Sequence, residues 1–578
     1  MIYSLLACAL LGQVAAQHLN TFQNPILPGF HPDPSCIHVP EDETFYCASS
    51  SFNVFPGIPI YASQDLTTWK LVGHVLNRRG QLPDIATSIG STSGIWAPTF
   101  RHHNGTYYLI TTLVHDKRPE ADPSRWDNII FTTTDLWKGE WSDAVHFKFQ
   151  GYDPSPVWDE QGNSYIVGAH AYRVSPGIHL AKVDLKTGEL KSNFTNVWNG
   201  TGGLAPEGPH IYRKDGYYYL LAAEGGTGKD HMVTFARSKS LYGPYENNPQ
   251  NPVLTNANTT NYFQATGHAD LFQDKRGNWW SVALAVRAGP DFVTFPMGRE
   301  TVLTNVTWTN GSWPLFNNPI QGRMRGWQLP RNTRKLPGTG HIATDGDDDL
   351  QFRPKSKIPS HFIYWRPPIQ ESYTISPPGH PNTLRLTPSK LNLTGLDGNS
   401  GGPGGQTFIG RRQVDTFFSY YVDFDFKPRV LEEEAGITLF LSQNHHARLG
   451  IALLPSNSTT PPTLTPHFRF HAISYIPVPA SFVVPVPVAW HNKPITLELE
   501  TLNTTHYAFS ANLAGSSARP RRLAIVPGEI ISWGFTGAIV GAYATANGGN
   551  GTAPAYVSNW NYEGWGQVRE TWEDVTPP

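Results

Sequence analysis

Short runs of aromatic and small apolar residues recur along the first half of the chain. Five such runs begin at positions 43, 105, 162, 216 and 277. Each starts with turn-forming residues, continues with a pair or near-pair of aromatic residues, and ends in small and apolar residues, as in GTYYLITT and GNWWSVAL. The pattern is typical of a short strand after a tight turn, and no convincing helical period appears among the runs.

The runs are evenly spaced. Their second aromatic residues are Tyr46, Tyr108, Tyr165, Tyr219 and Trp280, which lie 62, 57, 54 and 61 residues apart. A second recurring pattern follows several of these runs, as in IYASQDLTTW and HLAKVDLKTGEL. Repeats of this length, filled with short strands and turns, predict a β-propeller with one four-stranded sheet per repeat. Five repeats predict five blades.

A residue marked by proline, glycine or an aromatic neighbour lies about twelve positions upstream of each aromatic pair. These residues are Asp33, Trp96 with Ala97, Asp153, Glu207 and His268. In a propeller this point starts the innermost strand of each sheet, so the side chains would converge on one mouth of the central channel. A single Asp-Pro or Glu-Gly pair more often marks only a turn. Three carboxylates in phase with one repeat favour a site.

The second half of the chain has a different pattern. A stretch rich in proline and basic residues, QLPRNTRKLPGTGH, leads to DGDDD, which lacks the spacing of an EF-hand. Strand-like alternation broken by Gly, Pro and Asn follows and predicts a β-sandwich. We therefore predict an all-β protein with a signal peptide at 1–16, a five-bladed propeller at 17–320, a linker at 321–352 and a β-sandwich domain at 353–578.

Composition narrows the class of ligand. The chain has 578 residues, too many for one ordinary core, and only 16% of them are charged, with a net charge of -2. Nucleic acid needs a basic face, so it is not an expected partner. Aromatic residues make up 12% of the chain, including 18 Trp, which suits a neutral ligand such as a sugar.

The N-terminus and the sequons predict secretion. The start, MIYSLLACALLGQVAAQ, reads as a signal peptide with cleavage near Ala16, although it lacks a basic n-region. Ten N-x-[ST] sequons fit an extracellular glycoprotein, and no other stretch is apolar enough to span a bilayer. Cys36 and Cys47 flank a plausible hairpin, so a disulfide and two reduced cysteines both remain open.

The three carboxylates suit the hydrolysis of a glycosidic bond. One acid protonates the leaving oxygen and one base activates water on the other side of the sugar. Asp33 and Glu207 belong to repeats that can face each other across a channel. Asp153, one repeat from Glu207, would raise the pKa of that acid through the repulsion of like charges.

Several motifs together resemble glycoside hydrolase family 43, in its secreted fungal-type α-L-arabinofuranosidase or β-xylosidase form with a C-terminal sandwich. They include GFHPDPSCI, GIWAPTF, YDPSPVWDEQGNSY, APEGPHIY, TGHADLF and MGRETVLTNVTW, in the family's order over residues 24–316. The resemblance implies a five-bladed propeller and an inverting mechanism. It makes Asp33 the general base, Glu207 the general acid and Asp153 the residue that tunes and orients Glu207.

The resemblance also implies substrate-binding residues, namely Phe52, Trp96, Ala97, His268 and Arg299. Phe52 and Trp96 match the aromatic walls of the subsite for the terminal sugar, and Arg299 matches a cation that holds a carboxylate or a hydroxyl. Arg287, in LAVRAG, is a rival for that role. His268 matches a channel histidine that lies close to a calcium ion in some members, so a structural calcium is conceivable, while no cofactor is expected to be required.

Other positions are expected to play supporting roles. We expect five residues only to pack in the fold or to support the site indirectly, namely His31, Trp158, Thr227, His231 and Trp279. GRRQVDTFF, EEEAGITLF and FTGAIVGAYA resemble the C-terminal sandwich of xylosidase-type members, which can close one side of the pocket. The loop SQNHHARLG, residues 442–450, is the candidate for that closure.

We thus expect an exo-glycosidase that acts on plant cell-wall arabinoxylan or on xylo-oligosaccharides. It would release terminal α-L-arabinofuranosyl residues, β-D-xylosyl residues or both. One alternative is a dominant β-1,4-xylosidase activity. Another is a carbohydrate-binding propeller without catalysis, which an amide in place of one acid would favour, and none is present. A fructan-cleaving hydrolase would carry NDPNG, which HPDPSC does not match.

Overall fold

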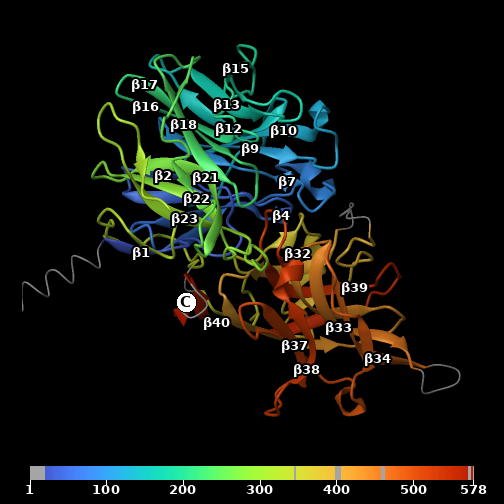
Figure 1. The fold of residues 1–578 in the computed structure, drawn as a ribbon. Helices are drawn as coiled ribbons and strands as arrows, with labels where there is room; N and C mark the ends of the chain where they lie inside the picture. The colour runs from blue at the N-terminus through green and yellow to red at the C-terminus, as the bar shows by residue number, and fades with distance from the viewer. Residues whose placement is uncertain (1–19, 344–345, 398–404, 457–462, 571–574, 577–578) are drawn as a thin grey trace, which may run out of the picture.

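The computed structural model describes residues 20–343, 346–397, 405–456, 463–570 and 575–576. The predicted signal peptide, 1–16, lies outside these residues. In the described part the regular elements are strands and five short 3-10 helices, in agreement with the predicted all-β class. None of these helices has the length and apolar character that a membrane crossing needs. Figure 1 shows β2 to β23 in one lobe and β32 to β40 in another.

Five antiparallel sheets build the N-terminal lobe. The first contains β2 (Ser35–Val39), β3 (Thr44–Ala48), β5 (Gly57–Ser63) and β6 (Lys70–Leu76). The second contains β7 (Gly94–Ile95), β8 (Thr99–His103), β9 (Thr106–Val114), β10 (Trp126–Thr133) and β11 (Val145–Phe147). The third contains β12 (Gly151–Trp158), β13 (Ser164–His170), β14 (Ile178–Lys182) and β15 (Thr195–Trp198).

The last two sheets of this lobe follow the same order. The fourth contains β16 (Glu207–Lys214), β17 (Tyr217–Glu224), β18 (Met232–Ser238), β19 (Glu246–Asn247) and β20 (Leu254–Thr255). The fifth contains β21 (Phe263–Gln273), β22 (Trp279–Arg287), β23 (Arg299–Thr307) and β24 (Leu315–Phe316). The repeated aromatic runs of the sequence form the strands β3, β9, β13, β17 and β22, each next to the innermost strand of its sheet.

The innermost strands contact one another in a closed order. β2 contacts β8, β8 contacts β12, β12 contacts β16, β16 contacts β21, and β21 contacts β2 again. The repeated aromatic residues fill the spaces between neighbouring sheets, and Tyr46, Tyr219 and Trp280 are buried almost completely. Side chains near the N-terminal ends of the innermost strands therefore share one central space.

Two larger sheets build the C-terminal lobe. The six-stranded sheet contains β30 (Thr407–Arg412), β32 (Glu434–Ser442), β33 (His445–Pro455), β34 (Leu464–Ile473), β35 (Phe482–Pro485) and β39 (Ile539–Thr545). The nine-stranded sheet contains β26 (Asp348–Leu350), β28 (Tyr373–Ile375), β29 (Leu384–Leu386), β31 (Phe417–Phe426), β36 (Ile495–Thr501), β37 (His506–Leu513), β38 (Arg521–Pro527), β40 (Ala555–Val568) and β41 (Val575–Thr576). Alternating apolar residues of both sheets share one core.

The two lobes are joined by specific contacts. Strand β4 (Val54–Phe55) pairs with β27 (Tyr364–Trp365) of the second half. Arg412 Nε donates to the carbonyl of Phe30 at 2.9 Å, and Arg287 Nη1 donates to the carbonyl of Val568 at 2.8 Å. Because β4 begins two residues after Phe52, these contacts hold the C-terminal lobe next to the predicted site.

The structure also answers the question about the cysteines. Cys36 on β2 lies directly opposite Cys47 on β3, and the two form a disulfide. One part of the predicted linker, β25 (Arg323–Arg325), pairs with β1 (Thr21–Gln23) of the N-terminal lobe.

Candidate active site

Irregularities in the innermost strands direct the predicted side chains to the centre. The pairing of β12 with β13 is interrupted around Asp153, and that of β16 with β17 is interrupted directly after Glu207. The pairing of β21 with β22 is interrupted around His268. Such bulges bend the strand and re-aim a side chain, and they are frequent next to active sites.

Four residues of the predicted site share a backbone conformation that is rare outside glycine. Asp33, Phe52, Asp153 and His268 have φ values of 51°, 49°, 52° and 48°. Each non-glycine residue in this left-handed region costs on the order of 1–3 kcal/mol and persists only where the surrounding structure fixes it. The surrounding structure therefore holds these four residues in a strained backbone conformation that fixes the positions of their side chains.

The carboxylate of Asp33 is held on both oxygens. Ser50 Oγ donates to Oδ2 at 2.6 Å, and Arg299 Nη1 donates to Oδ1 at 3.3 Å. The same Oδ1 lies 3.9 Å from Nδ1 of His268. Asp33 is only 5% exposed, so its orientation is set by these three side chains. A carboxylate aimed in this way suits a general base.

Glu207 and Asp153 receive fewer hydrogen bonds. The backbone N–H of Gly208 donates to Oδ2 of Asp153 at 2.9 Å, and the Tyr152 hydroxyl donates to Oε2 of Glu207 at 3.2 Å. Gly208 has a φ of +57°, and a Cβ there would lie 2.9 Å from the imidazole of His268. The residue after Glu207 must therefore be glycine.

The electrostatic environment keeps a proton on this pair of acids. Burial, together with the charges of Glu207 and Asp33, raises the pKa of Asp153 well above its usual value. Burial also raises the pKa of Glu207 to about 7, although Arg299 and the hydrogen bond from Tyr152 act in the opposite direction. Two buried carboxyl groups so close together titrate as a unit, and the pair retains a proton near neutral pH.

Arg299, rather than its rival Arg287, belongs to the site. Arg299 begins β23, donates through Nη2 to the carbonyl of Thr227 at 3.3 Å, and lies 4.5 Å from the ring centroid of Phe535. Arg287 ends β22 and pairs through Nε with Glu300 at 2.6 Å. It also contacts the C-terminal lobe, as described above, so its part is to hold the lobes together.

The structure brings all the predicted site residues to one cavity of about 470 Å³. Its lining includes Asp33, Phe52, Trp96, Ala97, Asp153, Glu207, His268 and Arg299. The rings of Phe52 and Trp96 lie 6.5 Å apart, and Trp96 Nε1 donates to the carbonyl of Thr92 at 2.8 Å. The cavity thus has an acidic end and an aromatic wall.

The C-terminal lobe supplies another part of the wall. Tyr475, Trp533 and Phe535 line the cavity. The predicted closing loop, 442–450, does not line it, and this expectation is corrected. Its residue His445 instead stacks on Trp533, with ring centroids 4.5 Å apart, and supports that wall from behind.

The five positions expected to play supporting roles divide into two groups. Thr227 lines the cavity and accepts a hydrogen bond from Arg299. The other four do not line it. They pack or bond inside the N-terminal lobe, His31 with Tyr61, Trp158 with His103, His231 with Gly226, and Trp279 with Trp308.

A second polar cluster lies farther along the same innermost strands. Arg101 donates to both oxygens of Asp270, at 2.6 and 2.9 Å. Ser35 Oγ and the Tyr212 hydroxyl each donate to Asp270 at 2.5 Å. Burial alone would raise the pKa of Asp270, but Arg101 holds it far below its usual range. We define these four residues as the Asp270 cluster.

The surroundings of His268 do not match the donor set that calcium prefers. Calcium takes six to eight oxygen ligands. The nearest carboxylate, Asp33, already engages Ser50 and Arg299 on its two oxygens. Both oxygens of Asp270, two residues along the strand, are occupied by Arg101. The side chains on this wall therefore offer calcium few free oxygens.

Several residues of the site escaped the sequence analysis. Tyr152, which contacts Glu207, directly precedes Asp153, so its place in the motif was a usable signal. Phe535 opens the segment FTGAIVGAYA, which was recognised only as sandwich. Tyr475 and Trp533 carry no local signal, because the docking of a distant lobe brings them to the cavity.

Comparison with known proteins agrees with this geometry. Residues 22–314 match the model of Glycosyl hydrolases family 43, and residues 351–563 match that of the Beta xylosidase C-terminal Concanavalin A-like domain. A non-reducing end alpha-L-arabinofuranosidase of Bacteroides ovatus is 34% identical over 93% of this chain and 93% of its own length. A xylosidase/arabinosidase of Humicola insolens is 39% identical over 51% of this chain and 55% of its own.

Solved structures extend the likeness over both lobes. A family 43 protein from a Bacteroides ovatus xyloglucan locus has a TM-score of 0.78 and 31% identity, covering 94% of this chain and 99% of that one. A family 43 protein of Bacillus licheniformis has a TM-score of 0.78 and 28% identity, covering 94% and 100%. The chain is a glycosidase and belongs to glycosyl hydrolases family 43.

Proposed function

We propose that this enzyme is an inverting exo-glycosidase that releases terminal α-L-arabinofuranosyl residues, β-D-xylosyl residues or both from arabinoxylan or xylo-oligosaccharides. The observation that carries the proposal is the charge arrangement in the cavity. A carboxylate held by a cation, Asp33, shares the space with an acid, Glu207, whose pKa is raised to about 7. One group can accept a proton while the other still has one to give.

The residues take complementary parts in one displacement. Glu207 donates its proton to the glycosidic oxygen as the bond from that oxygen to the anomeric carbon breaks. Asp33 takes a proton from the water that attacks the same carbon from the opposite side. Asp153 and Glu207 repel each other when both are charged, so the pair keeps a proton for transfer, and Arg299 orients Asp33. Asp33 precedes β2 of the first sheet and Glu207 begins β16 of the fourth, and an inverting pair needs room for a water between its two acids.

The size of the cavity supports attack on terminal units. Its volume of about 470 Å³ fits a small ligand, and walls from both lobes enclose it. Phe52 and Trp96 offer apolar faces to the sugar, while His268 and Arg299 offer donors for its hydroxyls. Relatives named for arabinofuranosidase, xylosidase/arabinosidase and beta-xylosidase activities support both sugars as candidates.

We also propose that the five N-terminal sheets are the blades of one five-bladed propeller. The closed order of contacts among β2, β8, β12, β16 and β21 supports this reading. The domains would then be the propeller at 17–320, the linker at 321–352 and the sandwich at 353–578. Secretion after removal of residues 1–16 remains part of the proposal, as does a plant cell-wall polysaccharide as the partner.

A paired assay tests the function. Wild type and Glu207→Ala are compared on p-nitrophenyl α-L-arabinofuranoside and p-nitrophenyl β-D-xylopyranoside. We expect wild type to hydrolyse at least one of them and the variant to lose that activity. Equal activity of both proteins would remove Glu207 from the mechanism, and activity on the xyloside alone would favour a dominant xylosidase.

The stereochemistry tests the part of Asp33. NMR of the first-formed sugar should show the inverted anomer, because a water activated by Asp33 attacks directly. Net retention would contradict the assignment of Asp33 as a base. Binding of xylo-oligosaccharides without hydrolysis of any substrate would instead favour a carbohydrate-binding protein.

A further inference from the structure

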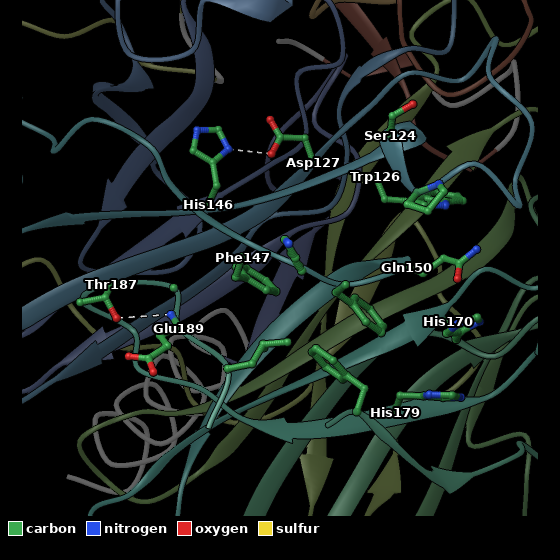
Figure 2. A pocket seen from close by; sticks show the side chains of 16 residues that line it. Ser124, Trp126, Asp127, His146, Phe147, Gln150, His170, His179, Thr187 and Glu189 are labelled. Carbon is green, nitrogen blue, oxygen red and sulfur yellow. Dashed lines mark hydrogen bonds and ion pairs between the residues drawn. The ribbon is translucent and has the colours of Figure 1, made fainter. Parts of the chain in front are cut away.

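A second, more open cavity lies between the second and third sheets. Its volume is about 1070 Å³, and its lining comes from β10, β11, β13, β14 and the connections between them. Figure 2 shows His146 turned toward Asp127 in one part of this cavity and His170 beside His179 in another. We call it the inter-sheet groove.

The inter-sheet groove adjoins the catalytic cavity. Trp126 lines both of them, and its ring stacks on Tyr152 at a centroid distance of 5.4 Å. Gln150 lines the groove and stands three residues before Asp153. Three residues of extended chain span about 10 Å. A chain that leaves the catalytic cavity past Trp126 can therefore reach the groove.

The lining suits a neutral sugar chain. Phe149 and Phe194 stack with ring centroids 4.2 Å apart, and Phe194 is half-buried, so part of its ring faces outward. His170 and His179 also stack, at 4.7 Å. Rings of this kind contact the C–H faces of sugars, while their polar edges and the amide of Gln150 can bond to hydroxyls.

The charged residues that line the groove are of both signs, Lys148 against Asp127 and Glu189, and Glu189 pairs with Lys191 at 2.6 Å. His146 Nδ1 lies 2.7 Å from Oδ1 of Asp127, so these two side chains pair with each other. Burial, followed by the neighbouring His170, lowers the pKa of His179 to about 4, which leaves it neutral at most working pH values. A strongly charged ligand finds no matching field among these side chains, whereas a neutral polysaccharide needs none.

We propose that the inter-sheet groove binds the main chain of a neutral pentosan while the catalytic cavity holds a terminal unit of the same molecule. The proposal rests on the function proposed above. In this proposal the groove distinguishes long substrates from short ones, because a small aryl glycoside occupies the catalytic cavity alone. The groove should therefore affect polymers and leave small substrates unchanged.

The test uses the double variant Phe194→Ala/His179→Ala, which leaves the sequon at Asn193 intact. Tyr242→Ala is the matched control, since Tyr242 is 50% exposed and lines neither cavity. All proteins are first treated with an endoglycosidase, so that a glycan on Asn193 cannot cover the groove. Steady-state kinetics are measured on soluble arabinoxylan and on the p-nitrophenyl glycosides.

We expect KM for arabinoxylan to rise about tenfold in the double variant, because two such ring contacts are together worth roughly one tenfold step in affinity. Its kinetics on the aryl glycosides and all kinetics of Tyr242→Ala should equal those of wild type. An equal loss on both substrate types, or no loss on either, would overturn the proposal.

A binding readout separates this proposal from the proposed function. Glu207→Gln is introduced into wild type and into the double variant, and both proteins run in gels that contain arabinoxylan. Retardation that the double variant loses supports the groove without requiring any hydrolysis. Equal retardation of the two proteins would refute the groove, even if the aryl glycosides establish the glycosidase function.

Discussion

Two groups of buried carboxylates lie at the centre of the five N-terminal sheets, and they differ in charge balance. In the Asp270 cluster one carboxylate receives two hydrogen bonds from Arg101 and two from hydroxyl groups. In the catalytic cavity Arg299 is the cation that acts on Asp33, Asp153 and Glu207 together. The first arrangement lowers the pKa of Asp270, and the second raises that of Glu207.

The difference shows how one topology gives both a fully paired carboxylate and a group of acids that retains a proton. The same strand β21 carries His268 into the cavity and Asp270 into the cluster, two residues apart. Hydrogen-bonded pairing makes a buried carboxylate inert, whereas shared burial without enough partners leaves a proton poised for transfer. We therefore expect changes in the cavity to affect activity and changes in the cluster to affect stability.

The largest expected effect is on catalysis. Glu207→Gln removes the proton donor, so kcat on an aryl glycoside should fall by about 10²–10⁴-fold.

The same substitution should not lower the melting temperature, and at high pH it should raise it. The folded-state pKa of about 7 exceeds the ordinary 4.5, so the stability that Glu207 contributes below pH 4.5 is lost as pH rises through 7. The variant should equal wild type in melting temperature below pH 4.5 and match or exceed it above pH 7, and a lower value there would contradict this account.

The next effect is on stability. Asp270→Asn leaves Arg101 buried with a neutral partner, and breaking a buried pair costs about 3–5 kcal/mol. Urea denaturation should show this loss near neutral pH. The double variant Asp270→Leu/Arg101→Met serves as control, since removing both charges should cost less than removing one. A full loss of activity in Asp270→Asn at unchanged stability would break the comparison.

A smaller effect is expected on the pH profile. Asp153→Asn removes one negative charge beside Glu207, so the acid should lose its proton at a lower pH. The alkaline limb of kcat/KM, expected near the Glu207 pKa of about 7, should shift toward acid. Asp270→Asn serves as the reference, and the alkaline limb of its kcat/KM profile should stay at the wild-type pH. If the alkaline limb of Asp153→Asn stays at the wild-type pH, Asp153 does not raise the pKa of Glu207.

The sequence was informative where the repeat itself places the chemistry. Asp33, Asp153 and Glu207 were predictable because a period of about 60 residues brings equivalent positions of consecutive sheets together. The choice between Arg299 and Arg287 was not, because both lie at strand ends and differ only in which partners face them. Glu300 and the C-terminal lobe engage Arg287. Local sequence does not record such long-range pairing.

The contribution of the C-terminal lobe was harder still to predict. Phe535 and Trp533 reach the cavity only because β4 pairs with β27 and docks the second lobe beside Phe52. The segment predicted for this task, 442–450, does not line the cavity, and its residue His445 stacks on Trp533 instead. The direction of a side chain at a domain interface depends on the docking angle, which no short motif encodes.

The smallest predicted effect concerns how firmly each guanidinium is held. Arg101 is fixed by two hydrogen bonds to one carboxylate, whereas Arg299 has longer bonds and a cation–π contact with Phe535 at 4.5 Å. Phe535→Leu keeps an apolar wall but removes that contact, which is worth about 0.5–2 kcal/mol. We expect kcat/KM to fall by roughly twofold to thirtyfold at an unchanged melting temperature, since RT ln 10 is about 1.4 kcal/mol. Trp565→Leu is the control, because Trp565 is exposed and does not line the cavity, and it should leave kcat/KM unchanged. A loss of stability in Phe535→Leu without a kinetic effect would mean that Phe535 holds the lobes together and that Arg299 is positioned by Asp33 alone.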